Sequence, residues 1–143
     1  MKSRAGAIVH IGLCCMICAA LPASPALADT EIDCANATAT AELNACADRE
    51  LQAADKELNA VYRSALAAVP SLAAEKPYDA KSWEKALRAS QRAWVGYRDA
   101  ECAGHLAMFW QGGTGASADI LGCKTALTKD RTEQLKSRYQ TQR

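Results

Sequence analysis

Apolar residues recur every three or four positions over residues 40–69, and charged residues fill the other faces. The apolar stripe comprises Leu43, Ala47, Leu51, Ala54, Leu58, Val61 and Ala65. This spacing predicts one long amphipathic helix. Pro70 is expected to stop that helix, because proline interrupts the backbone hydrogen bonds. Residues 70–79, which include a second proline at Pro77, are then expected to form a linker.

A second helical pattern runs from about residue 80 or 82 to residue 110. Its apolar and aromatic face comprises Trp83, Leu87, Ser90, Trp94 and Tyr97. Glycines at positions 96 and 104 each lower the local helix propensity by up to about 1 kcal/mol. A kink or break is therefore expected near position 104.

A third helical pattern covers about residues 117–139 and follows a glycine-rich turn at residues 111–116. Its stripe comprises Ile120, Cys123, Leu127 and Leu135. The chain contains no useful length of alternating apolar and polar residues that would indicate a strand. We therefore predict an all-α fold, a small antiparallel bundle of about three helices.

The N-terminus has the organisation of a secretory signal peptide. Lys2 and Arg4 precede an apolar run of about 17 residues, which is shorter than the ~20 residues that a membrane-spanning helix needs. Small residues at Ala26 and Ala28 then match a cleavage site before Asp29. We expect residues 1–28 to be removed, which leaves a single domain at residues 29–143, periplasmic or secreted and without a membrane anchor. A retained anchor is the less favoured alternative.

Charge gives little guidance to a partner. Removal of Lys2 and Arg4 leaves 15 basic residues against 16 acidic ones, so the remaining chain has a net charge near −1. A near-neutral chain with mixed charges offers no electrostatic argument for binding nucleic acid or anionic lipid.

The cysteines divide into three in the N-terminal apolar run and four in the helical body. In an exported protein, the four at Cys34, Cys46, Cys102 and Cys123 favour two disulfides, with three connectivities to choose from. Cys102 and Cys123 flank the glycine turn, so antiparallel helices would bring them level. Cys34 precedes the first helix and Cys46 lies two turns inside it. We favour Cys34–Cys46 and Cys102–Cys123, and the crossed pairings remain alternatives.

Several strings together resemble a family of small exported bacterial domains, the N-terminal domain of the LprI-type lysozyme inhibitors. They are the four cysteines, ADKELNAVY at residues 54–62, QRAWVGYRDAEC at residues 91–102, the turn at residues 112–114 and the pattern T-x2-R-x3-L at residues 128–135. The resemblance covers residues 34–135. It implies an all-α disulfide domain of the bacterial envelope or medium and inhibition of a lysozyme, although the chain lacks a convincing lipoprotein cleavage motif.

The residues in these strings are expected to be mainly structural. They are Asp55, Asn59, Tyr62, Trp94, Tyr97, Arg98, Asp99 and Arg131. Trp94, Tyr97 and Arg98 share one side of a helix, which indicates a core aromatic pair or, alternatively, a recognition patch. Arg131 points along the apolar stripe and needs a partner, for which Asp55 or Asp99 is our candidate. Asn59 is expected to cap or bridge helices.

The loop at residues 110–117 is the candidate partner-binding surface. A disulfide between Cys102 and Cys123 would brace both of its arms, and a preorganised loop loses less entropy on binding. A lysozyme cleft presents two catalytic carboxylates, so a protein that fills it needs hydrogen-bond donors or cations. Together with His105 and the loop amides, the candidate residues are Trp110, Gly112, Gly113, Thr114, Ser117 and Lys124.

An enzyme is disfavoured. After removal of the signal peptide His105 is the only histidine, and the chain has no serine-hydrolase, phosphate-binding or zinc-protease motif. The remaining cysteines have no C-x2-C spacing, so no metal site and no cofactor are expected. Two readings remain: an inhibitor that binds and blocks the cleft of a lysozyme, and a non-inhibitory protein-interaction module of the envelope. The sequence leaves the oligomeric state open.

Overall fold

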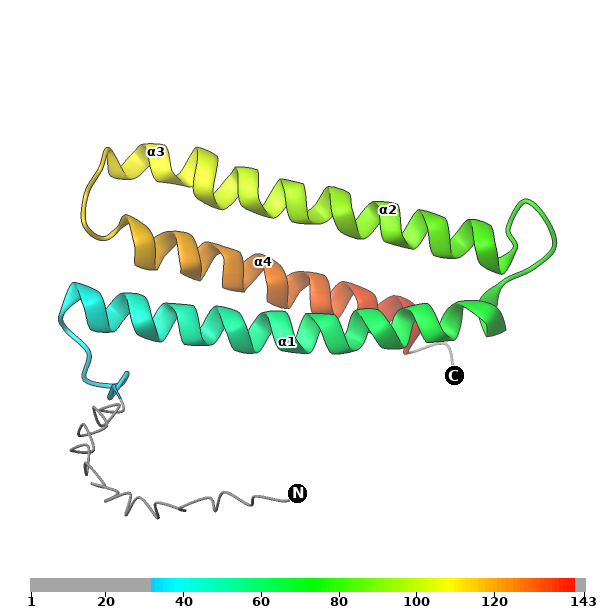
Figure 1. The fold of residues 1–143 in the computed structure, drawn as a ribbon, viewed down its shortest axis with the longest axis horizontal. Coiled ribbons are helices and arrows are strands. Elements are labelled where there is room, and N and C mark those ends of the chain that lie inside the picture. The colour runs from blue at the N-terminus through cyan, green and yellow to red at the C-terminus, as the bar shows by residue number, and fades with distance from the viewer. Residues whose placement is uncertain (1–31, 141–143) are drawn as a thin grey trace, which may run out of the picture. The chain divides into compact units, whose positions relative to one another are not determined.

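The computed structural model describes residues 32–140, so the expected signal peptide lies outside the described residues. Over this range the chain forms helices joined by short connections, with no strand (Figure 1). The elements are α1 (Thr40–Leu72), α2 (Ala80–Asp99), the π-helical turn η1 (Ala100–Leu106), α3 (Ala107–Trp110) and α4 (Ala116–Tyr139).

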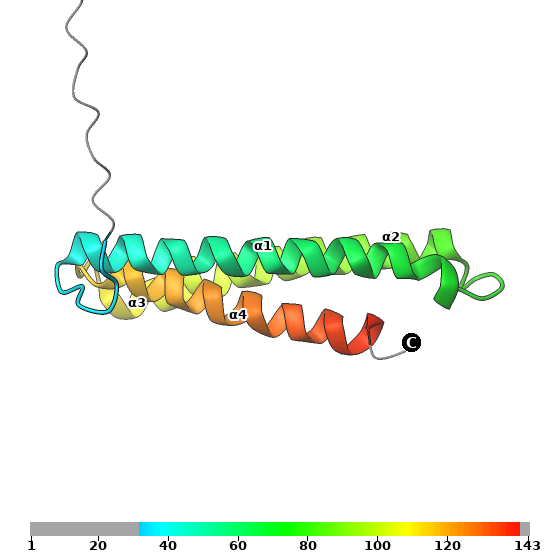
Figure 2. The same ribbon diagram turned by 90° about the horizontal axis from the view of Figure 1, so that it is seen from below.

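Three long helices lie side by side within residues 32–140. α1 and α4 run in the same direction, and α2 runs in the opposite direction beside them (Figures 1 and 2). The connections between α1 and α2 and between α3 and α4 therefore lie at opposite ends of the bundle. Disulfides join Cys34 to Cys46 and Cys102 to Cys123. These observations confirm the all-α fold and the favoured pairing of the cysteines.

The core forms where the predicted stripe of α1 meets the other two helices. α1 buries Leu58, Val61, Ala65 and Val69, and these side chains cluster with Leu87 of α2 and with a leucine of α4 at position 135. The periodic pattern thus identified the buried face of α1 from Ala54 to Ala65. It was wrong at the start of the helix, where Leu43 is 43% exposed because only the later turns of α1 pack in the core. Burial of this kind contributes roughly 25 cal/mol for each Å² of apolar surface removed from water.

The buried face of α4 differs from the predicted stripe. Threonines at positions 125, 128 and 132 are buried with Arg131 and Leu135, whereas the predicted Ile120 and Leu127 are only half-buried. The Thr125 hydroxyl donates to the carbonyl of residue 121 at 2.9 Å, and the hydroxyl of residue 132 donates to that of residue 128 at 2.9 Å. Satisfied hydroxyls can be buried at low cost, so a polar sequence covers a buried helix face.

The predicted end of the first helix changes, and the predicted start of the second helix is confirmed at Ala80. α1 continues through Pro70 to Leu72, because a proline in the last turn removes only one hydrogen bond near the helix end. α2 begins after Asp79, whose carboxylate accepts the Ser82 N–H at 2.8 Å as an N-terminal cap. Near Gly104 the expected break is a change of hydrogen-bonding pattern: regular α-helix ends at Asp99 and η1 follows.

Candidate functional site

The α3–α4 connection turns tightly with glycine-dependent geometry. Gln111 and Gly112 have positive φ angles of 46° and 85°, in the left-handed region that glycine adopts without strain. The Gly113 N–H donates to the Trp110 carbonyl at 2.7 Å, and the Ala116 N–H donates to the Gly113 carbonyl at 3.2 Å. The loop is therefore closed by its own backbone hydrogen bonds.

Trp110 clamps this loop onto the start of α4. Its indole N–H donates to the Asp119 carboxylate at 2.7 Å. Its ring lies against Gly113 and Gly115, and a Cβ atom on Gly115 would lie 2.5 Å from the ring atom Cζ3. Only glycine fits at position 115 without displacing the indole. Trp110, which is still 37% exposed, therefore supports the loop by packing on its glycines at the surface.

A disulfide also joins the two arms of this loop. Cys102 in η1 is completely buried and bonds to Cys123 in α4, with Cα atoms 5.7 Å apart. Among the described helices, η1 packs against α2, α3 and α4, and α3 packs against η1 and α4, whereas α1 does not approach either element closely. The disulfide and the Trp110 clamp together preorganise the loop, as the sequence led us to expect of the disulfide.

Two large apolar side chains stand exposed beside this loop, and the sequence reasoning missed them. Met108 is 73% exposed and Phe109 is 72% exposed. The Phe109 ring packs edge-on to His105, with ring centroids 5.4 Å apart. The available signal was the run of five apolar residues at positions 106–110, which places apolar side chains all around the helix instead of along one stripe. We call residues 105–117 the tip.

The candidate residues predicted for the loop divide into three groups. Thr114 and Ser117 are exposed on the tip, as is Gly112. Trp110 serves as the clamp described above. Lys124 points elsewhere, because its ammonium group pairs with the Asp99 carboxylate at 3.1 Å. Lys124 is therefore omitted from the candidate surface.

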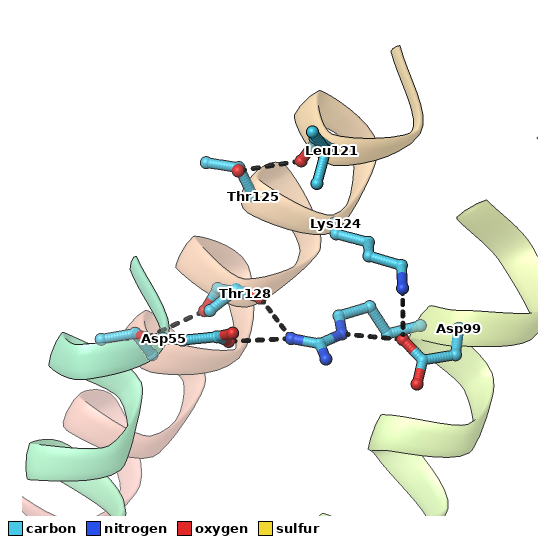
Figure 3. A network of polar contacts seen from close by, with 8 residues as sticks. Asp55, Asp99, Leu121, Lys124, Thr125 and Thr128 are labelled. Atoms are coloured by element: carbon cyan, nitrogen blue, oxygen red, sulfur yellow. Dashed lines mark hydrogen bonds and ion pairs between the residues drawn. The ribbon is translucent and has the colours of Figure 1, made fainter. Parts of the chain in front are cut away.

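Arg98 is the centre of a polar network that joins the three long helices. One guanidinium nitrogen, Nη1, donates to Asp55 of α1 at 2.8 Å and to Thr128 of α4 at 3.0 Å, while Nε lies 3.4 Å from Asp99 (Figure 3). The Arg98 side chain is only 13% exposed and lies over the ring of Trp94, 5.2 Å from its centroid. Because this guanidinium group is largely buried and contacts all three long helices, Arg98 has a structural role in the bundle.

The charges of this network act on Asp99. A hydrogen bond from Lys124 is the main cause that lowers the pKa of the Asp99 carboxyl below its ordinary value of 3.8, and the nearby Arg98 lowers it further. Tyr97, by contrast, is exposed and takes no part in the core, so the expected aromatic pair is wrong for Tyr97. Trp94 packs against the core as expected.

Arg131 is buried as predicted, but the predicted partner is wrong. Its guanidinium donates to Gln91 at 3.1 Å, to Ser90 at 3.0 Å and to Gln134 at 2.7 Å, all neutral groups. Burial is the main cause that lowers the pKa of Arg131. The proposed carboxylates bind Arg98 instead, because Arg131 lies farther along α4 and reaches a different stretch of α2.

The remaining motif residues do not form a site. Tyr62 packs against the core, and Asn59 is exposed on α1.

Over residues 32–140, no three His, Cys, Asp or Glu side chains gather closely enough to hold a metal ion. None of the helices in that range is both long and apolar enough to cross a membrane.

Comparison with known proteins places these features in a family. The family model described as "Lysozyme inhibitor LprI" matches residues 33–135. An uncharacterized protein of Rhizobium meliloti (strain 1021) is 38% identical over 125 residues, which cover 85% of this chain and 87% of that protein. No solved structure matches the chain.

Proposed function

The chain belongs to the lysozyme inhibitor LprI family, and from that premise we propose that it is exported, binds a lysozyme and blocks its catalytic cleft. Two disulfides are typical of proteins outside the reducing cytosol. A lysozyme also meets the cell wall outside the cytosol. The family is one of inhibitors, and we propose that this chain acts by occupying the cleft and catalyses no reaction.

We propose the tip as the inhibitory surface. The observation that supports this most is that Met108 and Phe109 are exposed beside a braced loop. Exposed aromatic side chains on a preorganised support are typical anchors of protein interfaces, because they bury large areas with little loss of conformational freedom. The loop joins α3 to α4 at one end of the bundle (Figure 1).

The chemistry of the tip also suits a cleft that holds carboxylates. Residues 106–118 contain no Asp, Glu, Lys or Arg, and the adjoining Asp119 carboxylate accepts the Trp110 indole N–H, so the loop brings little like charge toward catalytic carboxylates. The Thr114 hydroxyl, the His105 ring and the loop backbone can donate hydrogen bonds to them. We therefore propose that the tip binds a lysozyme through complementary shape, apolar contacts and hydrogen-bond donors that are neutral or weakly charged.

The test compares two variants that replace large side chains of similar exposure. In one variant Met108 and Phe109 are both replaced by serine. The control replaces Tyr78, which is 70% exposed and lies at the opposite end of the bundle. Lysis of a cell-wall suspension by c-, g- and i-type lysozymes is measured with each oxidised protein.

The proposal predicts that at least one lysozyme is inhibited and that the double variant loses at least about 30-fold in potency, as a pair of interface anchors should. Tyr78→Ser should inhibit like the wild type. Equal inhibition by the wild type and the double variant would remove the tip from the proposal. A folded, oxidised protein that inhibits none of the three types would favour the non-inhibitory envelope module instead.

A further inference from the structure

Four basic side chains form a straight stripe along the exposed side of α2. Lys81, Lys85, Arg88 and Arg92 are spaced four, three and four residues apart, and each is exposed. At about 1.5 Å of rise per residue the stripe is roughly 16 Å long. With Glu84, these residues line a shallow hollow of about 360 Å³. We call the four residues the α2 stripe.

The positive charge of the stripe is largely uncompensated. Glu84 is the single acid among its lining residues and pairs with Arg88 at 2.7 Å. Within residues 32–140, Lys81, Lys85 and Arg92 form no ion pair, although the charge of Lys81 acts on the Asp79 carboxyl two residues before it. Cations elsewhere, such as Lys136 with two carboxylates, are compensated by neighbours. The near-zero net charge of the chain therefore conceals a local charge of about +3 on this stripe.

An apolar and aromatic feature adjoins the N-terminal end of the stripe. Tyr78, three residues before Lys81, is 70% exposed. With Pro77, Trp83 and Ala86 it lines a hollow of about 450 Å³. A tyrosine has an apolar ring and a polar tip, so it is suited to the headgroup level of a lipid bilayer.

We propose that the α2 stripe and Tyr78 dock the protein on an anionic phospholipid surface. Clustered basic residues on one helix face are typical of anionic lipid binding, and each contributes roughly five-fold to partitioning onto such a surface. Three net charges then contribute roughly 100-fold. The cations are long, exposed and in a straight line, which suits a flat array of phosphates. The adjoining exposed tyrosine favours a lipid surface over a soluble anionic polymer.

The experiment measures co-sedimentation with phosphatidylcholine vesicles, with and without phosphatidylglycerol. In the stripe variant Lys81, Lys85, Arg88 and Arg92 all become glutamine. The matched control makes the same change of net charge elsewhere, at four exposed cations without an ion pair: Lys56, Arg63, Lys129 and Arg138. Circular dichroism checks that both variants remain helical.

The wild type and the control variant should bind the vesicles that contain phosphatidylglycerol and leave them at high salt. Removing four cations while Glu84 remains changes the local charge from about +3 to about −1, so the stripe variant should lose roughly 600-fold in partitioning. Tyr78→Ser alone should weaken the binding of the wild type without changing its salt dependence. No binding by the wild type, equal losses in both variants, or equal binding to neutral vesicles would overturn the proposal. Stronger competition by soluble polyglutamate than by anionic vesicles would also overturn it. Lysozyme inhibition in a lipid-free assay should be unchanged in the stripe variant, so docking and inhibition can fail separately.

Discussion

Removal of each disulfide in turn should separate stability from function. The variants are Cys34→Ala with Cys46→Ala, and Cys102→Ala with Cys123→Ala. The sequence separations are 12 and 21 residues. In the chain-entropy model these loops correspond to about 2.8 and 3.3 kcal/mol of stabilisation, respectively. The two losses of stability should therefore be similar, roughly 10–15 °C in melting temperature for a domain of this size.

The effects on inhibition should differ greatly. The Cys102–Cys123 bond lies in the two arms of the tip, whereas Cys34–Cys46 ties the N-terminal segment to α1, which does not approach η1 or α3 closely. Only loss of the first bond should release the tip and make it pay an ordering cost on binding.

Thermal melting followed by circular dichroism gives the stability, and lysis assays are performed well below the lower melting temperature. The variant that lacks Cys102–Cys123 should be at least about ten-fold weaker as an inhibitor, which corresponds to 1.4 kcal/mol. The variant that lacks Cys34–Cys46 should inhibit like the wild type. Equal potency of the two variants would refute the reasoning that the braced tip binds the lysozyme.

Three other predictions follow from named contacts. Gly115→Ala should displace Trp110, change its fluorescence and weaken inhibition. Gly122→Ala is the matched control: the structure places no neighbouring element within 4 Å of the new methyl group, so this change should stabilise α4 by roughly 0.5–1 kcal/mol. Lys124→Gln should raise the pKa of Asp99 in a carboxyl NMR titration. Because folding lowers that pKa, the stabilisation is complete above the ordinary value of 3.8 and is lost as the pH falls through the lowered value, so the variant should lose less stability in acid. Inhibition should change little between low and moderate salt in the lysis assay, because residues 106–118 carry no charged side chain; a steep salt dependence would contradict this reading.

The sequence was most informative where apolar periodicity alone determines packing. The stripe of α1 was predicted correctly from Ala54 to Ala65, where aliphatic and alanine side chains mark the buried face, but not at Leu43, which is exposed. α4 could not be predicted in this way, since its buried threonines satisfy their hydroxyls within their own helix. A hydrophobicity pattern cannot distinguish such a face from an exposed one.

Contacts that depend on the register between helices were beyond the sequence. Arg98 and Arg131 both lie on inward faces, and the sequence led us to assign Asp55 or Asp99 to Arg131, which was the wrong arginine. The offset between the helices gives both carboxylates to Arg98 and neutral partners to Arg131. The pairing of the cysteines was predictable because each pair is bridged by a short segment with one dominant turn.

The tip was predicted only in part for a related reason. Glycines and flanking cysteines identified the loop, but nothing in the sequence showed that Trp110 folds onto the loop while Phe109 stays exposed to solvent. That difference arises because the indole finds both a carboxylate, Asp119, and the space left by Gly115.

The central claim is that the tip occupies the cleft of a lysozyme. The most direct test titrates a lysozyme with the oxidised protein in the presence of increasing concentrations of a cell-wall oligosaccharide that fills the same cleft. The account predicts saturable, stoichiometric inhibition that the oligosaccharide relieves competitively. Binding that is undisturbed by saturating oligosaccharide, or no inhibition at a large excess of fully oxidised and helical protein, would contradict it.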